Sequence, residues 1–187
     1  MGTFVALLRG INVGGKNRLL MKDLVAIFER AGCTHVRSYI QSGNVVFDAS
    51  PELARGIEAL VSAKISASFG LGVPVLVRSA RELQTVARHN PFLGTGVSVE
   101  SLHVVFLAED PGKSRAAALD PDRSPPDTFV TRGREIYLAC PNGMGKTKLT
   151  SAWFDAKLGT ISSARNWKTV LELVAMCGEP KAPARRA

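Results

Sequence analysis

Apolar and polar positions alternate in two different periods along the first half of the chain. Short apolar runs indicate strands, and apolar residues at three- and four-residue spacing indicate helices, each closed by a turn residue. Pro74 cannot donate to a central ladder, so the last of these strands is expected at a sheet edge. The predicted elements are strand 3–9, helix 20–31, a hairpin of strands 35–40 and 44–47, a helix from Ser50-Pro51 to near Gly70, and strand 73–77.

The second half repeats this order with different residues. A capping box at Ser79-Ala80-Arg81-Glu82 begins a connecting helix that stops at Asn90-Pro91. The elements predicted beyond it are strand 102–107, a weak helix 111–119, a hairpin of strands 127–131 and 135–139, helix 147–158, strand 160–162 and an extra helix 166–177. Each half therefore has the order βαββαβ. The pattern predicts an α+β protein of two ferredoxin-like domains (α-β plaits) with an extra C-terminal helix.

Domain boundaries follow from these elements. We expect a first domain over residues 1–78, a connecting helix and linker over 79–98, and a second domain with the extra helix over 99–178. Residues 179–187 are rich in Pro, Ala and Arg without apolar periodicity, and we expect a disordered basic tail there.

Composition narrows the class of partner. The 187 residues carry a formal net charge of +8, which favours acidic partners such as nucleotides or nucleic acid, although basic proteins without such a role are common. The apolar run Phe4 to Leu8 is too short for a signal sequence or a membrane span, so no membrane partner is expected. Three widely spaced cysteines without a C-x-x-C pair fit a reducing compartment, and we expect a cytoplasmic protein.

The nine residues from Arg9 to Asn17 join an apolar strand to an amphipathic helix, and they hold three glycines between cationic side chains. Glycines let backbone N–H groups turn outward, and a helix N-terminus attracts anions. In a βαββαβ sandwich this loop and the turn after the second strand emerge at one edge. The first predicted ligand site is Arg9, Gly10, Asn12, Gly14, Gly15, Lys16, Asn17, Gln41, Ser42 and Asn44. The alternative is that these residues only satisfy turns and cap backbone groups.

A second site is predicted at the opposite edge of the second half. Two segments meet there, each expected to begin a helix with cations nearby. The residues assigned to this site are Gly145, Lys146, Thr147, Arg165 and Asn166. Simple N-capping by Thr147 and Asn166 is the alternative.

Both glycine loops nearly match the phosphate-binding pattern G-x-x-x-x-G-K-[ST], but neither does. The first has Asn17 where a hydroxyl belongs, and the second has Cys140 where a glycine belongs. Ser42 lacks the glycines of a nucleophile elbow, and the three histidines show no ligand spacing, so we expect no metal and no cofactor. The strands also lack the repeated aromatic residues of RNA-recognition modules.

Four segments spread over the chain resemble a known family. They are Arg9 to Asn17, Tyr39 to Phe47, Asn90-Pro91-Phe92 and Arg165-Asn166-Trp167, and they are similar to the signature segments of the bacterial domain-of-unknown-function 1697 family. The resemblance implies two ferredoxin-like domains. It supplies no activity and no catalytic residues.

Three functions remain open. The sequence favours binding of a phosphorylated or polyanionic ligand, a nucleotide or nucleic acid, through the glycine-rich basic loops. An enzyme acting on a small phosphorylated metabolite would need a proton-transfer group, for which Asp23, Tyr39 and Asp48 are the nearest candidates. A scaffold or dimer could pair through the apolar strand Val73 to Val77, so a monomer and a homodimer are both compatible with the sequence.

Overall fold

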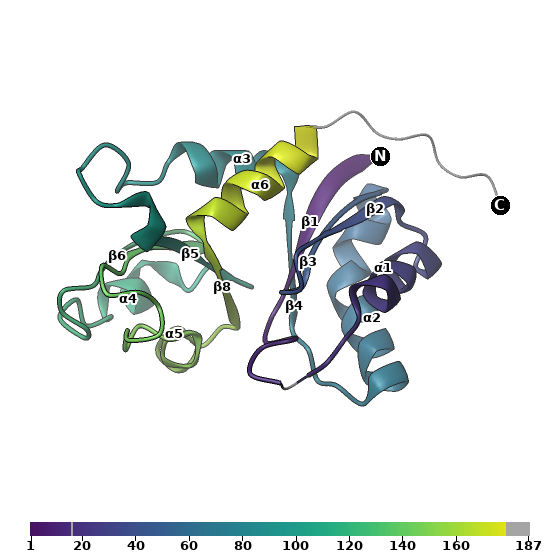
Figure 1. The fold of residues 1–187 in the computed structure, drawn as a ribbon, viewed down its shortest axis with the longest axis horizontal. Helices are drawn as coiled ribbons and strands as arrows, with labels where there is room; N and C mark the ends of the chain where they lie inside the picture. The colour runs from purple at the N-terminus through teal and green to yellow at the C-terminus, as the bar shows by residue number, and fades with distance from the viewer. Residues whose placement is uncertain (16, 179–187) are drawn as a thin grey trace. The chain divides into compact units, whose positions relative to one another are not determined.

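A computed structural model describes residues 1–15 and 17–178 (Figure 1). Lys16 and the predicted basic tail 179–187 lie outside the described residues. The chain divides into two compact units, each built around its own four-stranded antiparallel sheet. The first unit runs from Met1 to Gln84 and takes in the described residues from Leu173 on, and the second unit runs from Thr85 to Glu172.

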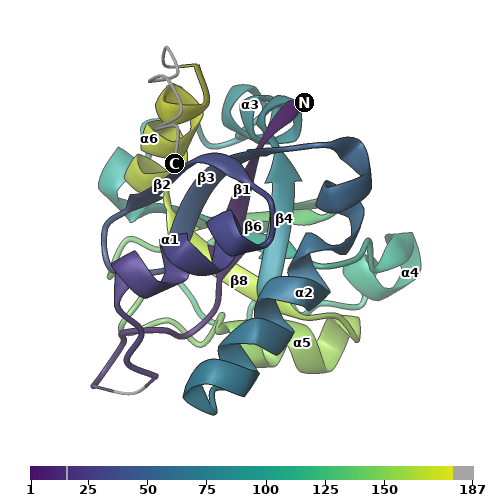
Figure 2. The same cartoon turned by 90° about the vertical axis from the view of Figure 1, so that its right-hand side faces the viewer.

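The first unit has the predicted βαββαβ order, and its strands lie in the order β2-β3-β1-β4. Helices α1 and α2 cover one face of this sheet (Figure 2). The elements are β1 (Gly2–Leu8), α1 (Met21–Arg30), β2 (Thr34–Tyr39), β3 (Asn44–Ala49), α2 (Pro51–Phe69) and β4 (Val75–Ser79).

The core of the first unit lies between the sheet and its two helices. Alternate strand residues such as Leu8 and Phe47 point to this side, because successive side chains of a strand face opposite ways. Phe28 of α1 meets them, with its ring 5.0 Å from that of Phe47. Ser50 accepts a hydrogen bond from the Leu53 amide and begins α2, as the Ser-Pro pair predicted.

Strand β4 lies at the edge of the sheet, so the prediction from Pro74 is confirmed. Its backbone is covered by side chains of the same unit. The Val77 amide donates to the Glu58 carboxylate at 2.6 Å, and the Ser79 amide donates to Glu82 at 2.7 Å. The second of these bonds belongs to the predicted capping box, which begins helix α3 (Ala80–Arg88). A partner strand would have to displace both carboxylates.

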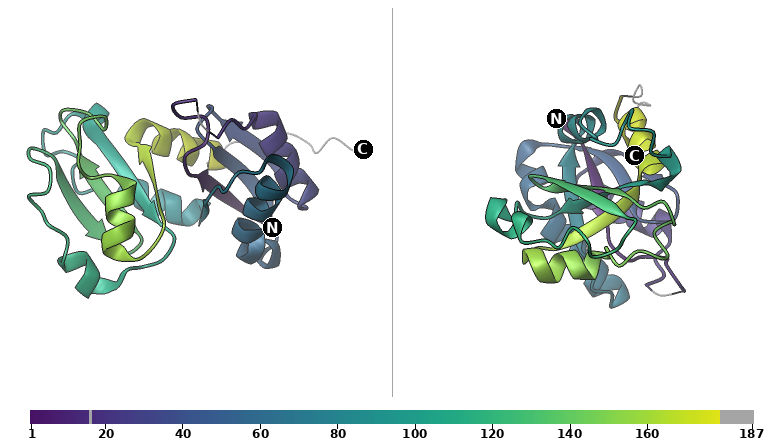
Figure 3. Two further views of the ribbon diagram at one scale, coloured as in Figure 1. Left: turned by 90° about the horizontal axis from the view of Figure 1, so that it is seen from below. Right: turned by 90° about the vertical axis from the view of Figure 1, so that its left-hand side faces the viewer.

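The second unit, coloured from teal to yellow-green in Figure 3, repeats the element order. Its strands lie in the order β6-β7-β5-β8. Its core gathers Val105 and Leu138 of the sheet with Phe154 of α5. The six-residue α4 buries none of its side chains, in keeping with the weak helix predicted there. The elements are η1 (Val99–Ser101), β5 (Leu102–Leu107), α4 (Gly112–Ala117), β6 (Thr128–Arg132), β7 (Glu135–Ala139), α5 (Ser151–Leu158), β8 (Ser162–Asn166) and α6 (Trp167–Gly178).

Two predicted elements of the second unit are wrong in their bounds. Helix α5 begins at Ser151 rather than at Thr147, because Thr150 caps it by accepting from the Trp153 amide. The last strand covers Ser162–Asn166 rather than 160–162. Its residues are mostly polar and carry no strand pattern, and they become a strand by pairing with β5, where Arg165 lies opposite Val104.

Helix α6 belongs partly to each unit. The predicted boundary kept it whole in the second domain, whereas the backbone contacts group its residues from Leu173 with the first unit. Arg37 of β2 donates to the Met176 carbonyl, which ties this end of α6 to the first sheet. None of the helices in the described part of the chain has the length and apolar character that a membrane span requires.

A substitution at Gly43 tests how closely the β2–β3 turn packs against the end of β1. We expect Gly43→Ala to lower the free energy of unfolding by about 2–4 kcal/mol, because of its positive φ and because its new Cβ would lie 2.7 Å from the Leu8 Cβ. Gly10→Ala is the control, since Gly10 shares the positive φ but has nothing within 4 Å of an added Cβ. Urea denaturation of both variants measures the difference, and equal losses would contradict the close approach.

Candidate functional site

The loop after β1 and the turn between β2 and β3 lie at the same edge of the first sheet, as the sequence predicted. Leu7 is paired with Asn44, so the end of β1 meets the start of β3. The Leu8 amide continues this contact by donating to the Gly43 carbonyl at 2.8 Å. We call residues 9–15, 17–20 and 40–43 the loop edge.

The side chain of Asn12 holds the loop edge together. Its amide nitrogen donates to the carbonyls of Leu19 and Gln41, both at 2.8 Å, and its oxygen accepts from the Leu19 amide at 2.9 Å. One side chain therefore joins the start of the loop to its end and to the β2–β3 turn. Asn12 has φ +55, a conformation that asparagine tolerates better than most residues.

Other predicted site residues also bond within the loop edge. Asn17 donates from its side chain to the Gly10 carbonyl at 2.9 Å. Buried Asn44 donates to the Tyr39 carbonyl and to the Ser42 hydroxyl. The side-chain amides of all three asparagines are thus engaged inside the chain, where they shape the loop edge.

The tip of the loop is the exposed part of this edge. Gly14 and Gly15 both have positive φ, are exposed, and have nothing within 4 Å of an added Cβ. The dark purple loop segment that follows β1 projects past the end of the sheet (Figures 1 and 2). The segment that contains this tip is cationic, and the sequence holds no Asp or Glu from residue 9 to residue 22. The cationic residues are Arg9, Lys16, Arg18 and Lys22.

Helix α1 begins at the end of this loop without a side-chain cap. Its N-cap residue is Leu20, with φ −67 and ψ 136, and no side chain accepts from the first amides of the helix. Leucine is among the least suitable N-cap residues because it offers no acceptor. The partial positive charge of the helix N-terminus therefore lies at the end of the segment that carries the cations, and Asp23 in the first turn is the first acidic residue after them in the sequence.

The three candidate proton-transfer groups are not gathered at the loop edge. Asp48 lies near the opposite end of β3, where it accepts from the Thr3 hydroxyl at 2.7 Å and faces the His35 ring nitrogen at 3.0 Å. This half-buried pair was not predicted from the sequence, because His35 and Asp48 come from different strands and meet at a β-bulge. Asp23 and Tyr39 do lie beside the loop edge.

The second predicted site is spread along its edge of the second sheet. Thr147 accepts from the Leu149 amide and does not cap a helix, so the prediction that Gly145, Lys146 and Thr147 begin one is wrong. Asn166 does cap α6, accepting from the Thr169 amide at 2.7 Å. Gly145 and Lys146 are exposed.

Arg165 is buried within the second sheet rather than displayed at a surface. It donates to the Ser163 hydroxyl at 2.8 Å and to the Ala164 carbonyl at 2.7 Å, and burial lowers its pKa to about 10. Arg78 of β4 holds the corresponding place in the first unit and donates to the Val77 carbonyl. The sequence predicted a ligand-binding role for Arg165, because the residues next to an arginine in the chain do not indicate whether its side chain is buried.

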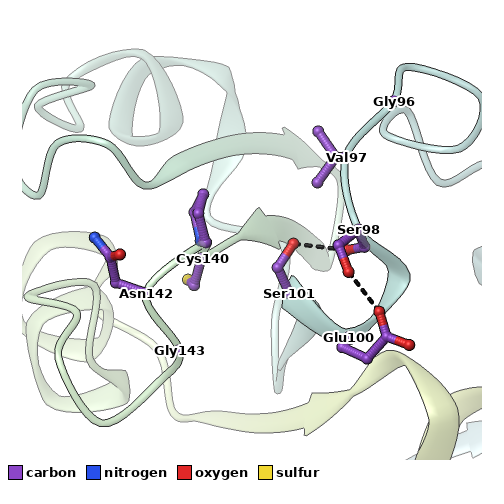
Figure 4. Close-up of a pocket in the computed structure, with 9 residues that line it drawn as sticks. Gly96, Val97, Ser98, Glu100, Ser101, Cys140, Asn142 and Gly143 are labelled. Carbon is purple, nitrogen blue, oxygen red and sulfur yellow. Dashed lines mark hydrogen bonds between the residues drawn. The ribbon is translucent and has the colours of Figure 1, made fainter.

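An open pocket of about 620 Å³ lies at this edge of the second unit, between the segment before β5 and the loop after β7 (Figure 4). Its walls include Val97, Ser98, Glu100, Ser101, Cys140 and Asn142. Glu100 is the one charged side chain among the described residues that line it, and a hydrogen bond from Ser98 lowers the pKa of its carboxyl. Burial raises the pKa of the Cys140 thiol to about 11, so this sulfur stays protonated at neutral pH.

Among the described residues, no three His, Cys, Asp or Glu side chains come together in a way that could hold a metal ion.

The two four-stranded antiparallel sheets and their helices define an α+β protein. The family model described as "Protein of unknown function (DUF1697)" matches residues 1–137, so the chain belongs to this family. A conserved bacterial protein of Streptococcus pneumoniae, SP0830, has a solved structure with a TM-score of 0.70 at 20% sequence identity. The match covers 94% of this chain and 98% of that one, and it shows a shared fold. No curated protein matches the chain.

The role of the Asn12 hydrogen bonds can be tested with a variant that keeps the shape of the side chain but loses its N–H donor. We expect Asn12→Asp to lower the free energy of unfolding by about 2–3 kcal/mol, because the Leu19 and Gln41 carbonyls would face a carboxylate instead of a donor. Asn17→Asp removes one exposed bond and should cost about 1 kcal/mol or less. Urea denaturation compares the two, and a loss at Asn17 as large as that at Asn12 would contradict the central role of Asn12.

A substitution at the uncapped start of α1 is expected to stabilise the protein, unlike the Asn12 substitution. Leu20→Ser should raise the free energy of unfolding by about 1 kcal/mol, because the extended backbone at this position suits an N-cap and serine supplies the missing acceptor. Leu20→Ala, which adds no acceptor, is the control and should leave stability nearly unchanged. Thermal unfolding reports both, and a serine variant no more stable than the alanine variant would show that these amides need no cap.

Proposed function

We propose that the protein binds a phosphorylated or polyanionic ligand, a nucleotide or nucleic acid, at the loop edge of the first unit. We also propose that both units are ferredoxin-like domains of a bacterial cytoplasmic protein. The strand orders and the three free cysteines, Cys33, Cys140 and Cys177, support this second proposal.

One combination of features carries the binding proposal: an uncapped helix N-terminus and an exposed glycine tip belong to the same segment, which has cations and no carboxylate from residue 9 to residue 22. Backbone amides at a helix N-terminus bind phosphate through their dipoles and unpaired N–H groups. Glycines at the tip allow a ligand to approach the backbone, because no Cβ stands in its way. Arg9, Lys16 and Arg18 would add the charge that attracts it.

The Asn12 bonds hold the two ends of this loop in place. They connect both ends of the loop to the β2–β3 turn. Chain ends that are already held lose less conformational entropy on binding. The asparagines then act as supports, and Arg9, Gly14, Gly15 and Lys16 with the start of α1 are the proposed contacts.

The pocket of the second unit is a poorer place for an anion. Its charged wall residue is Glu100, an exposed carboxylate that would repel a phosphate. Lys146 is exposed beside this edge but does not line the pocket. We therefore propose the first of the two predicted sites as the principal one.

The two alternative functions have less support. A scaffold that pairs through β4 would compete with Glu58 and Glu82 for the edge amides. An enzyme at the loop edge would have Asp23 and Tyr39 at hand but not Asp48, which lies at the far end of its strand. Neither alternative has an observation that favours it over binding.

The salt dependence of binding tests the proposal. We expect affinity for a short single-stranded oligonucleotide, measured by fluorescence anisotropy, to fall steeply between about 50 and 200 mM salt. Arg18→Ala and Lys16→Ala should each weaken binding and flatten the slope of log K against log salt by about one unit. Lys157→Ala, an exposed lysine of α5, is the matched control and should change neither. A salt-independent affinity, or equal effects of all three variants, would count against the loop edge.

A further inference from the structure

The loop edge also displays aliphatic side chains that its fold does not require. Val13, Leu20 and Ile40 are exposed by 64%, 59% and 50%. Single exposed aliphatic residues are normal on protein surfaces, but these three belong to one small region. Leu20 and Ile40 directly adjoin Leu19 and Gln41, whose carbonyls bond to the same Asn12 nitrogen, and Val13 follows Asn12 in the chain.

Two of these positions would suit a polar residue better. Leu20 is an N-cap without an acceptor, where serine, threonine or asparagine stabilises a helix. Ile40 has φ +48, a left-handed conformation that β-branched residues rarely adopt and that asparagine and glycine accept readily. The chain thus keeps exposed aliphatic side chains where folding alone favours polar ones. Sites that break local folding preferences in this way are commonly functional.

The surroundings of the three residues indicate what they contact. Arg9, Lys16, Arg18 and Lys22 belong to the same stretch of chain, so a partner must offer both negative charge and apolar contact. Single-stranded nucleic acid is usually held by aromatic stacking, and the exposed apolar residues of this edge are aliphatic. A bilayer with anionic lipids offers phosphate-bearing headgroups above an apolar layer, which matches cations flanking aliphatic tips.

We propose that the loop edge docks on an anionic lipid surface, with Val13, Leu20 and Ile40 entering the interface and the cations meeting lipid phosphates. This inference rests on the proposed function, because the same anion-binding loop edge would take the phosphate of a lipid headgroup as well as that of a nucleotide or nucleic acid. The sequence-based expectation of no membrane partner considered signal sequences and spanning segments, whereas this edge would lie on the surface.

Vesicle sedimentation of the full-length protein tests the inference. We expect binding to vesicles of phosphatidylcholine with about one-third phosphatidylglycerol and little binding to phosphatidylcholine alone. Val13→Ser with Ile40→Asn keeps every cation and the start of α1, and should reduce binding by about tenfold. Val99→Ser with Ile161→Asn makes the same two changes at exposed positions of the second unit and should leave binding unchanged.

Parallel measurements separate this inference from the proposed function. The Val13→Ser, Ile40→Asn variant should bind the oligonucleotide as the parent does, and thermal unfolding should show that its fold is retained. Equal vesicle binding by this variant and the parent would overturn the inference. Binding to the oligonucleotide but not to anionic vesicles would also overturn it and leave the proposed function standing. Binding to neither would overturn both.

Discussion

The hydrogen bonds of one asparagine side chain determine the form of the loop edge. Asn12 satisfies the Leu19 and Gln41 carbonyls at once, so the position of the β1–α1 loop is coupled to that of the β2–β3 turn. Gly43 makes this possible, because any larger residue would collide with Leu8 and Ile11. Anchoring the two ends of the loop in this way reduces the number of conformations that these ends can adopt.

This anchoring separates the asparagines of the loop edge from its other polar residues. The asparagines are engaged with backbone groups and shape the loop, while the cations and the glycine tip are the groups that we propose as ligand contacts. The aliphatic residues form a third group, because Leu20 and Ile40 occupy positions at which a polar residue would stabilise the fold. At these two positions the residue present is less favourable for folding than a polar residue would be. Such a loss of stability is often found where residues serve a function.

The two units show how one topology can present different chemistry. Both have the same strand order, and Arg78 and Arg165 hold matching places in their last strands. The first unit ends its sheet with a cationic loop and an uncapped helix, whereas the second ends one edge with a pocket that has Glu100 as its charged wall. The difference comes from the loops, since the strands and core of both units are built alike.

The sequence by itself determined the βαββαβ order in both halves, the edge position of the strand after Pro74, the capping box at Ser79 to Glu82, and the meeting of two loops at one edge. These follow from local periodicity, from turn residues and from the direction of the strands. Only the tertiary structure decided that β8 is a strand, that Thr150 rather than Thr147 caps α5, and that Arg165 is buried. It also decided that Asn12 and Asn17 bond to carbonyls and that His35 meets Asp48. Each of these depends on contacts with residues that are not neighbours in the chain, or on which of several nearby residues caps a helix. The local sequence pattern does not specify which polar group a side chain will reach.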